Sequence, residues 1–554
     1  MLAAAALASA APAHAVDDTG AALNALVRAR LAEESGRPAA ALSALTTASS
    51  LAPDLPGLRG RILEQAIQAG DLDAARAAAL RLWAAGEHRF DAQLVLMVDA
   101  MRRSDWKAAR DLMSGRDDKT GADMIARLIQ PTVNAWIDVG AREKLPERHL
   151  LATSARTRPD PSLRLQAALV LTAVRRVDEA AALTDTITLT DRTSQLIAMR
   201  LAATLDAVGD RSGAKADARD AAKRLRERIA LAAGQREDPM LLLPDQPAST
   251  PRAGTALWLG LLADGLARTP GASPRVPLLF ARAAHWLNDE DWAVRATLVE
   301  ALEGNGQRDA AMKLLDGDGA PLPPALAMRR AELTAEAGDL AEAARLAEAA
   351  AAGTDARSLL VRLADVARRS DDPAAAARAY ERLEETLGNS DEDRSLRGSL
   401  WIARAELLLQ AGDWDAAEPL MEKAVALRPD DANILNFAGY SALERRKDVP
   451  QSLARIEAAW AREPQNASIT DSLGWAYFLT GRADDAVDLL EKAQRGAPDN
   501  AVIVEHLGDA YWKAGRKFQA RYSWRAAALL AEADMATRLA AKLRDGLTPA
   551  NTAP

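Results

Sequence analysis

The sequence contains no cysteine among its 554 residues. This absence excludes disulfide bonds, zinc sites built from thiolates, cysteine nucleophiles and a lipidated cysteine at a processed N-terminus. It does not distinguish an oxidising compartment from a reducing one, because a protein without thiols is compatible with both.

Aromatic residues, an excess of basic charge and long apolar runs are missing as well. Aromatic residues make up 4% of the chain, and 70 basic residues stand against 78 acidic ones, for a formal net charge of −8. Nucleic-acid binding calls for a basic patch, so we predict no nucleic-acid partner. After the first 15 residues, no stretch approaches the roughly 20 consecutive apolar residues needed to cross a bilayer. We therefore predict no membrane span.

Alanine, by contrast, is abundant, and it has the highest helix propensity of all residues. Hydrophobic residues make up 49% of the chain, which is enough apolar surface for a folded protein. A chain of this length is too long for a single compact core. We therefore predict an all-α protein that consists either of several domains or of one extended repeat array.

The sequence repeats with a period of about 34 residues, a length typical of repeats built from helix pairs. The period is clearest near the C-terminal end, where it separates Gly474 from Gly508 and Gly481 from Gly515. The N-terminal part repeats with the same period, and there an alanine follows each turn position five positions later. These pairs are Gly36 and Ala41, Gly70 and Ala75, and Ser104 and Ala109.

Each repeated residue has a role in a pair of packed helices. Glycine in the turn adopts a backbone conformation that other residues resist, and alanine allows the second helix to cross the first closely. Ala486, Leu490 and Ala493 follow at spacings of four and three, which places them on one helical face. Pro498 then prevents the helix from continuing.

The motif Leu473-Gly474-x-x-Tyr477, followed by Ala486, Leu490, Ala493 and Pro498, resembles the tetratricopeptide repeat. The resemblance implies antiparallel helix pairs that stack into a right-handed superhelical solenoid with a concave binding face. Residues 400–530 also resemble repeat arrays of exported or envelope-associated proteobacterial proteins.

Proline density and the N-terminal composition predict the organisation of the chain. Pro239, Pro244, Pro247 and Pro251 cannot share a helix, so they indicate either a joint between two solenoids or a loop inside one continuous superhelix. Ala13-His14-Ala15 before Val16 resembles a secretory cleavage site. We predict a signal peptide at 1–15, a divergent solenoid at 16–233, a proline-rich connection with non-repeat helices at 234–292, a repeat solenoid at 293–530, a capping helix at 531–547 and a flexible tail at 548–554.

Catalytic and metal-binding patterns are not found in the sequence. None of the five histidines, His14, His88, His149, His285 and His506, lies three or four residues from another, as a helical metal pair requires. No glycine-rich phosphate loop occurs either. We predict a protein that is not an enzyme and that has no cofactor and no bound metal.

The resemblance also implies which side chains line the concave face of the C-terminal repeats. They are Asn433, Asn436, Tyr440, Ser468, Asp471, Trp475, Glu505, Asp509 and Lys513. Their acidic character predicts a basic or neutral protein or peptide partner. The alternative is that the two aromatic residues, Tyr440 and Trp475, pack between neighbouring helices.

These observations predict a non-catalytic scaffold for protein–protein interaction. We expect it to be exported, to the periplasm or elsewhere outside the cytoplasm, and to support an assembly of the cell envelope. The alternative is a cytoplasmic repeat adaptor or chaperone-like protein whose N-terminus is merely rich in alanine.

Overall fold

The computed structural model describes residues 13–113, 121–156, 160–189, 191–209, 215–233, 238–316, 321–370 and 372–553. Every regular element in these ranges is a helix, so the predicted all-α fold class is confirmed. The chain forms two compact units, unit 1 (Met1–Ser370) and unit 2 (Asp371–Pro554).

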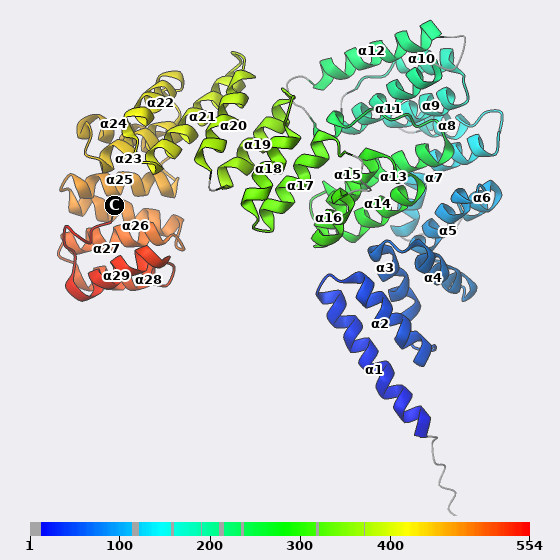
Figure 1. The fold of residues 1–554 in the computed structure, drawn as a ribbon, viewed down its shortest axis with the longest axis horizontal. Coiled ribbons are helices and arrows are strands. Elements are labelled where there is room, and N and C mark those ends of the chain that lie inside the picture. Colours follow the sequence, from blue (N-terminus) through cyan, green and yellow to red (C-terminus); the bar gives the residue numbers. More distant parts are fainter. Residues whose placement is uncertain are drawn as a thin grey trace, which may run out of the picture. The chain divides into compact units, whose positions relative to one another are not determined.

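Unit 1 is built from successive helix pairs, coloured from blue to green in Figure 1. Neighbouring helices in the chain pack against each other, for example α1 with α2, α11 with α12, and α17 with α18. Its helices are α1 (Ala13–Glu34), α2 (Pro38–Leu51), α3 (Leu58–Ala69), α4 (Leu72–Ala84), α5 (Phe90–Arg102), α6 (Trp106–Met113), α7 (Gly121–Gly140), α8 (Arg148–Arg156), α9 (Pro161–Ala173), α10 (Val177–Thr184), α11 (Arg192–Gly209), α12 (Lys215–Ala233), the short 3-10 helix η1 (Pro239–Leu242), α13 (Pro251–Ala267), α14 (Arg275–Leu287), α15 (Trp292–Gly304), α16 (Arg308–Asp316), α17 (Pro324–Glu336), α18 (Leu340–Ala350) and α19 (Arg357–Arg369).

Unit 2 repeats the same architecture with more regular pairs. The pairs α21 with α22, α23 with α24, α25 with α26 and α27 with α28 each pack closely, and α29 packs on α28. Its helices are α20 (Pro373–Glu385), α21 (Asp391–Gln410), α22 (Trp414–Leu427), α23 (Ala432–Glu444), α24 (Val449–Arg462), α25 (Ala467–Leu479), α26 (Ala483–Gly496), α27 (Ala501–Lys513), α28 (Lys517–Ala528) and α29 (Ala533–Asp545).

The pair α25 and α26 shows how the repeated residues determine the structure. The side chain of Asn466 accepts hydrogen bonds from two backbone N–H groups in the first turn of α25, which caps this helix. Gly481 follows α25 with a φ of 86°, in the left-handed region that favours glycine. The two helices then meet at small residues. Ala486 is fully buried, and a Cβ atom on Gly474 would lie only 2.7 Å from the side chain of Leu490.

The divergent repeats of unit 1 keep the same turn geometry where glycine is replaced. Ser104 occupies a turn position predicted from the period, and Arg175 occupies the turn between α9 and α10; their φ values are positive, 58° and 64°. Ala109 and Ala180, five positions later, are fully buried. The helix crossing therefore persists in these repeats although the glycine is absent.

The core of each unit continues from one helix to the next. In unit 1, one buried apolar cluster extends from α7 to α13 and includes the fully buried Trp136. Gly254 of α13 makes room for this ring, since a Cβ atom there would lie 2.0 Å from it. In unit 2, smaller clusters lie between successive helices. Each pair is thus stabilised largely by its neighbours, as in other solenoids.

Residues 234–292, predicted as a connection with non-repeat helices, contain η1, α13 and α14, and they lie within unit 1. Helix α14 packs against α3 and α5. The Trp286 indole donates a hydrogen bond to the carbonyl of Gly70 at 3.2 Å, and Arg282 donates one to the carbonyl of Gln68 at 3.0 Å. Unit 1 ends at Ser370, directly after α19, so the boundary between the units does not lie in the proline-rich segment.

The C-terminal residues also differ from the prediction. Helix α29 lies where the capping helix was expected. Residues 548–554 were predicted as a flexible tail, but their described part, 548–553, folds back to contact α27. Ala553 is buried, and its backbone N–H donates to Asp509 at 3.1 Å. The buried side chain of Asn551 donates to the carbonyl of Gly546 at 2.9 Å. These internal hydrogen bonds give the segment a fixed place.

The predicted signal peptide lies almost wholly outside the described residues, because α1 begins at Ala13. Among the described helices, none combines the length and the apolar character that a bilayer crossing requires. The described part of the chain also holds no cluster of histidine and acidic side chains placed to bind a metal ion.

Candidate partner-binding site

The nine residues predicted to line a groove in unit 2 lie on the first helices of three pairs, α23, α25 and α27. They do not form one open surface. Asn433, Ser468 and Lys513 are exposed, Asn436 and Tyr440 are half-buried, and Asp471, Trp475, Glu505 and Asp509 are buried.

Trp475 and Asp471 contact the next helix pair instead of solvent. The Trp475 ring stacks on His506 with ring centroids 4.0 Å apart, and on Phe478 at 4.5 Å. The Nδ1 atom of His506 lies 3.0 Å from each carboxylate oxygen of Asp471. Packing between helices is therefore the structural role of Trp475, and the prediction that these two side chains line an open groove is wrong.

Glu505 and Asp509 are bound by the chain's own cations. Arg538 donates to Glu505 at 2.8 Å, and the buried Lys542 ammonium lies 2.7 Å from both Glu505 and Asp509. The Trp524 indole donates to Asp509 at 2.8 Å. Because α29 supplies both cations, the prediction that these carboxylates face a partner is also wrong.

The pKa values of the two carboxyl groups shift in opposite directions. Burial acts to raise the pKa of Glu505, but the hydrogen bonds from Arg538 and Lys542 outweigh it and lower this pKa. Burial raises the pKa of Asp509, and Lys542 compensates for it only in part.

The sequence contained a signal for the contacts between α27 and α29. Arg538 follows Glu505 by nearly one full period, and Lys542 follows Asp509 by the same interval, so the repeat continues into α29.

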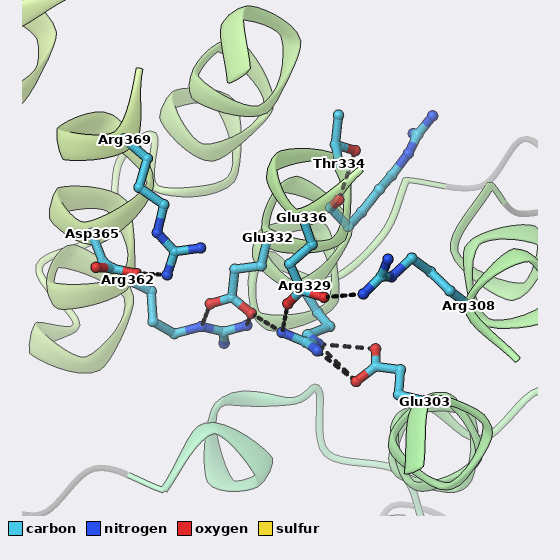
Figure 2. A network of polar contacts seen from close by, with 10 residues as sticks. Glu303, Arg308, Arg329, Glu332, Thr334, Glu336, Arg362, Asp365 and Arg369 are labelled. Carbon is cyan, nitrogen blue, oxygen red and sulfur yellow. Dashed lines mark hydrogen bonds and ion pairs between the residues drawn. The ribbon is translucent and has the colours of Figure 1, made fainter. Parts of the chain in front are cut away.

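Unit 1 carries a different set of charged side chains, which Figure 2 shows on α15, α17 and α19. We call Glu303, Arg329, Glu332 and Arg362 the ion-pair ladder. Arg329 donates to Glu303 at 3.0 Å and to Glu332 at 2.7 Å, and Arg362 donates to Glu332 at 2.9 Å. The ladder connects the first helices of three successive pairs through one continuous series of charged contacts.

The charges of the ladder determine the ionisation of its carboxylates. Burial acts to raise the pKa of Glu332, but the hydrogen bonds and charges of Arg362 and Arg329 outweigh it and hold the pKa below its usual value. Beside the ladder, burial raises the pKa of Glu300, and the charge of Arg268 offsets this only in part. The site therefore contains both a firmly ionised carboxylate and a more easily protonated one.

A cleft of about 80 Å³ lies beside the ladder in unit 1. Its walls come from α15, α17 and α19, from the first residue of α11, the residue after α13 and the segment around η1. Apolar and charged side chains both line it, which suits a binding site for a peptide side chain. The apolar lining residues are Met240, Leu243, Ala296, Val299, Ala325 and Leu326, and the charged ones are Arg192, Asp238, Arg268, Glu300, Arg329 and Arg362.

One wall of the cleft belongs to residues 238–248, which we call the strap segment. Apart from η1, it has no regular structure and it is held by side chains of α11. Arg192 pairs with the carboxylate of Asp238, with one contact of 3.2 Å. Arg200 donates to the backbone carbonyl of Gln246 at 2.8 Å. Helix α11 thus holds the strap segment in two ways, through the side chain of Asp238 and through the backbone carbonyl of Gln246.

The far end of the strap segment is fixed in the same way. The backbone N–H of Ala248 donates to the Thr204 hydroxyl at 2.9 Å, and the Gln246 side chain accepts from the backbone N–H of Trp292 at 2.8 Å. Leu243 is buried between these anchors. Backbone hydrogen bonds combined with a buried apolar side chain are the means by which grooves recognise extended peptides.

Sequence reasoning did not identify this site, although part of its signal is present. Glu303 and Glu336 are nearly one period apart, and so are Arg329 and Arg362, so the repeat placed these charges at equivalent helix positions. The prolines of the strap segment indicated only that it was not a helix. Nothing in a local pattern shows that such a segment will lie against α11, because its anchors are more than one full repeat away in the sequence.

A stack of antiparallel helix pairs, which recur at a regular period with left-handed turn residues, defines the chain as a helical-repeat protein. The tetratricopeptide repeat family matches residues 398–441 and 438–501. Residues 398–501 therefore carry tetratricopeptide repeats, as the sequence motif predicted. Repeats of this family typically mediate protein–protein interaction and are typically non-catalytic.

Among curated proteins, the TPR repeat-containing protein PA4667 of Pseudomonas aeruginosa is 28% identical over 116 residues. The matched region is 21% of this chain and 19% of that protein, so the chain spans about a fifth of this relative's length. A tetratricopeptide repeat protein from Parabacteroides merdae matches 46% of the chain and 97% of its own, with 15% identity and a TM-score of 0.37. The APC/C hetero-tetramer Cut9-Hcn1 matches 95% of the chain and 96% of its own, with 13% identity and a TM-score of 0.35.

Proposed function

We propose that this protein is a non-catalytic scaffold that binds an extended segment of a partner protein at the cleft beside the ion-pair ladder of unit 1. The observation that supports this most directly is the strap segment. The protein holds its own residues 238–248 there through backbone hydrogen bonds and a buried leucine. The adjoining cleft, which apolar and charged side chains line together, can receive a second stretch of chain.

The charge of the site favours a basic or neutral segment. Glu300 lines the cleft, and two further carboxylates, those of Glu303 and Glu336, lie on the helices α15 and α17 that form its walls. The arginine side chains that line the cleft already donate to carboxylates of the protein, so an acidic segment would compete with existing ion pairs. The exposed residues of the groove predicted from the sequence, Asn433, Ser468 and Lys513, belong to the proposal as a second contact surface within unit 2.

Filling the cleft tests the proposed binding site. The partner is first identified by proximity labelling in the native cell, and its affinity for the purified protein is then measured. Ala296 lines the cleft, so Ala296→Leu adds apolar volume there without changing charge. We expect this variant to bind the partner with about tenfold lower affinity, which corresponds to about 1.4 kcal/mol of binding free energy.

The matched control is Ala232→Leu, because this alanine is exposed on α12, away from the cleft. Circular dichroism at the working temperature verifies that both variants are folded. Equal affinity of the two variants and the original protein would exclude the cleft as the binding site.

We further propose that the scaffold is exported and supports an assembly of the cell envelope. The support for this proposal is the sequence Ala13-His14-Ala15 before Val16, which resembles a cleavage site for a signal peptidase. Mass spectrometry of the protein from its native cell should find an N-terminus at Val16. A retained Met1 would instead favour the alternative, a cytoplasmic adaptor.

A further inference from the structure

Helix α28 presents an apolar stripe to solvent. Phe518, Tyr522 and Leu529 are 83%, 71% and 88% exposed. They follow one another at spacings of four and seven, so they lie on one face of α28 and of Leu529, the C-cap residue that continues it. Leu530 is also exposed and extends the stripe. A contiguous exposed patch of large apolar side chains marks a surface that another molecule covers.

The repeat itself does not require these aromatic residues. One period earlier, α26 has Asp484 at the position of Phe518 and Asp488 at the position of Tyr522, and both aspartates are exposed. The buried residues of the two helices remain equivalent, since Ala486 and Ala520 are one period apart and both fully buried. The fold is therefore maintained with polar groups at the outer positions, and the aromatic side chains of α28 serve an external contact.

The stripe is accompanied by positive charge. Lys517, Arg521 and Arg525 lie on α28, which contains no acidic residue. None of these three cations forms an ion pair with a described residue. The Lys517 ammonium and the Arg521 guanidinium lie over the Trp512 ring, 5.2 Å and 5.1 Å from its centroid. Contact with a ring leaves hydrogen-bond donors of both groups available for an anion.

We propose that the outer face of α28 docks on an anionic lipid surface. Helices that lie in a membrane interface insert phenylalanine, tyrosine and leucine at the boundary of headgroups and acyl chains. Their lysine and arginine side chains attract the lipid phosphates, each by about 1 kcal/mol. Exposed apolar side chains and unpaired cations on one short helix meet both requirements.

The surrounding charges decide against other arrangements. The outer face of α26 carries Asp484 and Asp488, and the exposed Glu532 follows shortly after Leu530. An anionic surface repels these carboxylates, so the contact is restricted to α28, Leu529 and Leu530. Symmetric pairing of two copies through α28 would bring the cations of both copies together, which is unfavourable. An acidic protein is the remaining partner that fits the charge, and the experiment distinguishes it from lipid.

Vesicle flotation tests the proposal with the full-length protein. The probes are vesicles of phosphatidylcholine alone and vesicles in which about one third of the lipid is phosphatidylglycerol. We expect binding to the anionic vesicles only, and weaker binding as salt is added. The double variant Phe518→Asp with Tyr522→Asp introduces the residues that α26 carries, so it should fold, and it should lower binding at least about tenfold.

A second variant separates charge from apolar contact. Lys517→Gln with Arg525→Gln keeps the aromatic residues and should also reduce binding to the anionic vesicles. The control is Leu231→Asp, which alters an 85% exposed leucine on α12 of unit 1 and should leave binding unchanged. Two results would overturn the proposal: no binding of the original protein to anionic vesicles, or equal binding of the double aspartate variant. Capture of an acidic protein by α28 without vesicle binding would assign the face to that protein instead.

Discussion

At the scale of single residues, the most unusual feature is the fully buried ammonium of Lys542. It lies 2.7 Å from Glu505 and from Asp509, and neither carboxylate is exposed to solvent. A buried charge requires a partner, because the low-dielectric interior does not replace the hydration that the ion loses. Removing Lys542 therefore leaves the carboxylate of Asp509 without a cation, while Glu505 keeps Arg538.

We predict that Lys542→Met lowers the free energy of unfolding by about 3 kcal/mol, within the range for breaking a buried ion pair. Urea unfolding, followed by tryptophan fluorescence and circular dichroism, measures this change. Adding Asp509→Asn to the same chain should restore part of the loss, because it removes one uncompensated charge. The control Lys513→Met changes an exposed lysine and should have little effect. Equal stability of the Lys542 and Lys513 variants would contradict the role of the buried cation.

His285 provides a second prediction at this scale, and it concerns pH. Burial on α14 lowers the pKa of His285 to about 4, and the charge of Arg282 acts in the same direction. In the unfolded chain, a histidine has a pKa of about 6.5. As the pH falls, the unfolded state therefore takes up this proton first, so the folded state loses stability through the interval between these two values.

We expect His285 to remove about 2 kcal/mol of stability between about pH 7 and pH 5. The variant His285→Gln should lack this part of the pH dependence, and urea titrations at both pH values measure it. His88→Gln, at an exposed position, serves as the control and should keep the dependence of the original protein. The same pH dependence in both variants would show that His285 does not contribute.

At the scale of elements, the helix pairs could be predicted from the sequence because their determinants are local. Turn glycines, crossing alanines and the capping residues recur at a fixed period, and each acts within a few residues of its own position. Burial of Asp471, by contrast, depends on His506, which belongs to the next pair. The position of a side chain relative to the next pair decides whether it faces solvent, and the motif of one repeat does not contain that information.

The segment after α29 leads to a prediction at this scale. Deleting residues 547–554 removes the backbone donor of Ala553 from the buried carboxylate of Asp509, together with the apolar contacts of Leu547. We expect a loss of about 2 kcal/mol in unfolding free energy, since a buried acceptor loses a hydrogen bond. Thermal unfolding of the truncated and complete chains measures it. Removal of Pro554 alone is the control, and identical melting of all three chains would show that the segment does not stabilise the fold.

At the scale of the whole molecule, stability comes from contacts between neighbouring pairs. The long-range hydrogen bonds that join α14 to α3 show that distant pairs also contact each other within unit 1. Within unit 2, the helix contacts connect each pair with the next one. A solenoid of this kind is approximately a sum of repeat stabilities and nearest-neighbour terms.

We therefore predict that residues 371–554 fold when they are expressed alone. The fragment should be helical by circular dichroism and should unfold cooperatively in urea, because its apolar clusters are formed by its own helices. A fragment that is unfolded or that aggregates at low concentration would contradict the independence of unit 2.

The contacts of α29 have a consequence for protein engineering. Arg538 and Lys542 stand about one period after Glu505 and Asp509, in the place that the first helix of a following pair would take. The junction between α28 and α29 is therefore a place where additional repeats can be inserted as modules. An inserted module should be accepted only if its first helix carries two carboxylates for α29 and also two cations for Glu505 and Asp509. The terminal helix then finds the same partners at the new end of a longer array, and no buried carboxylate is left unpaired.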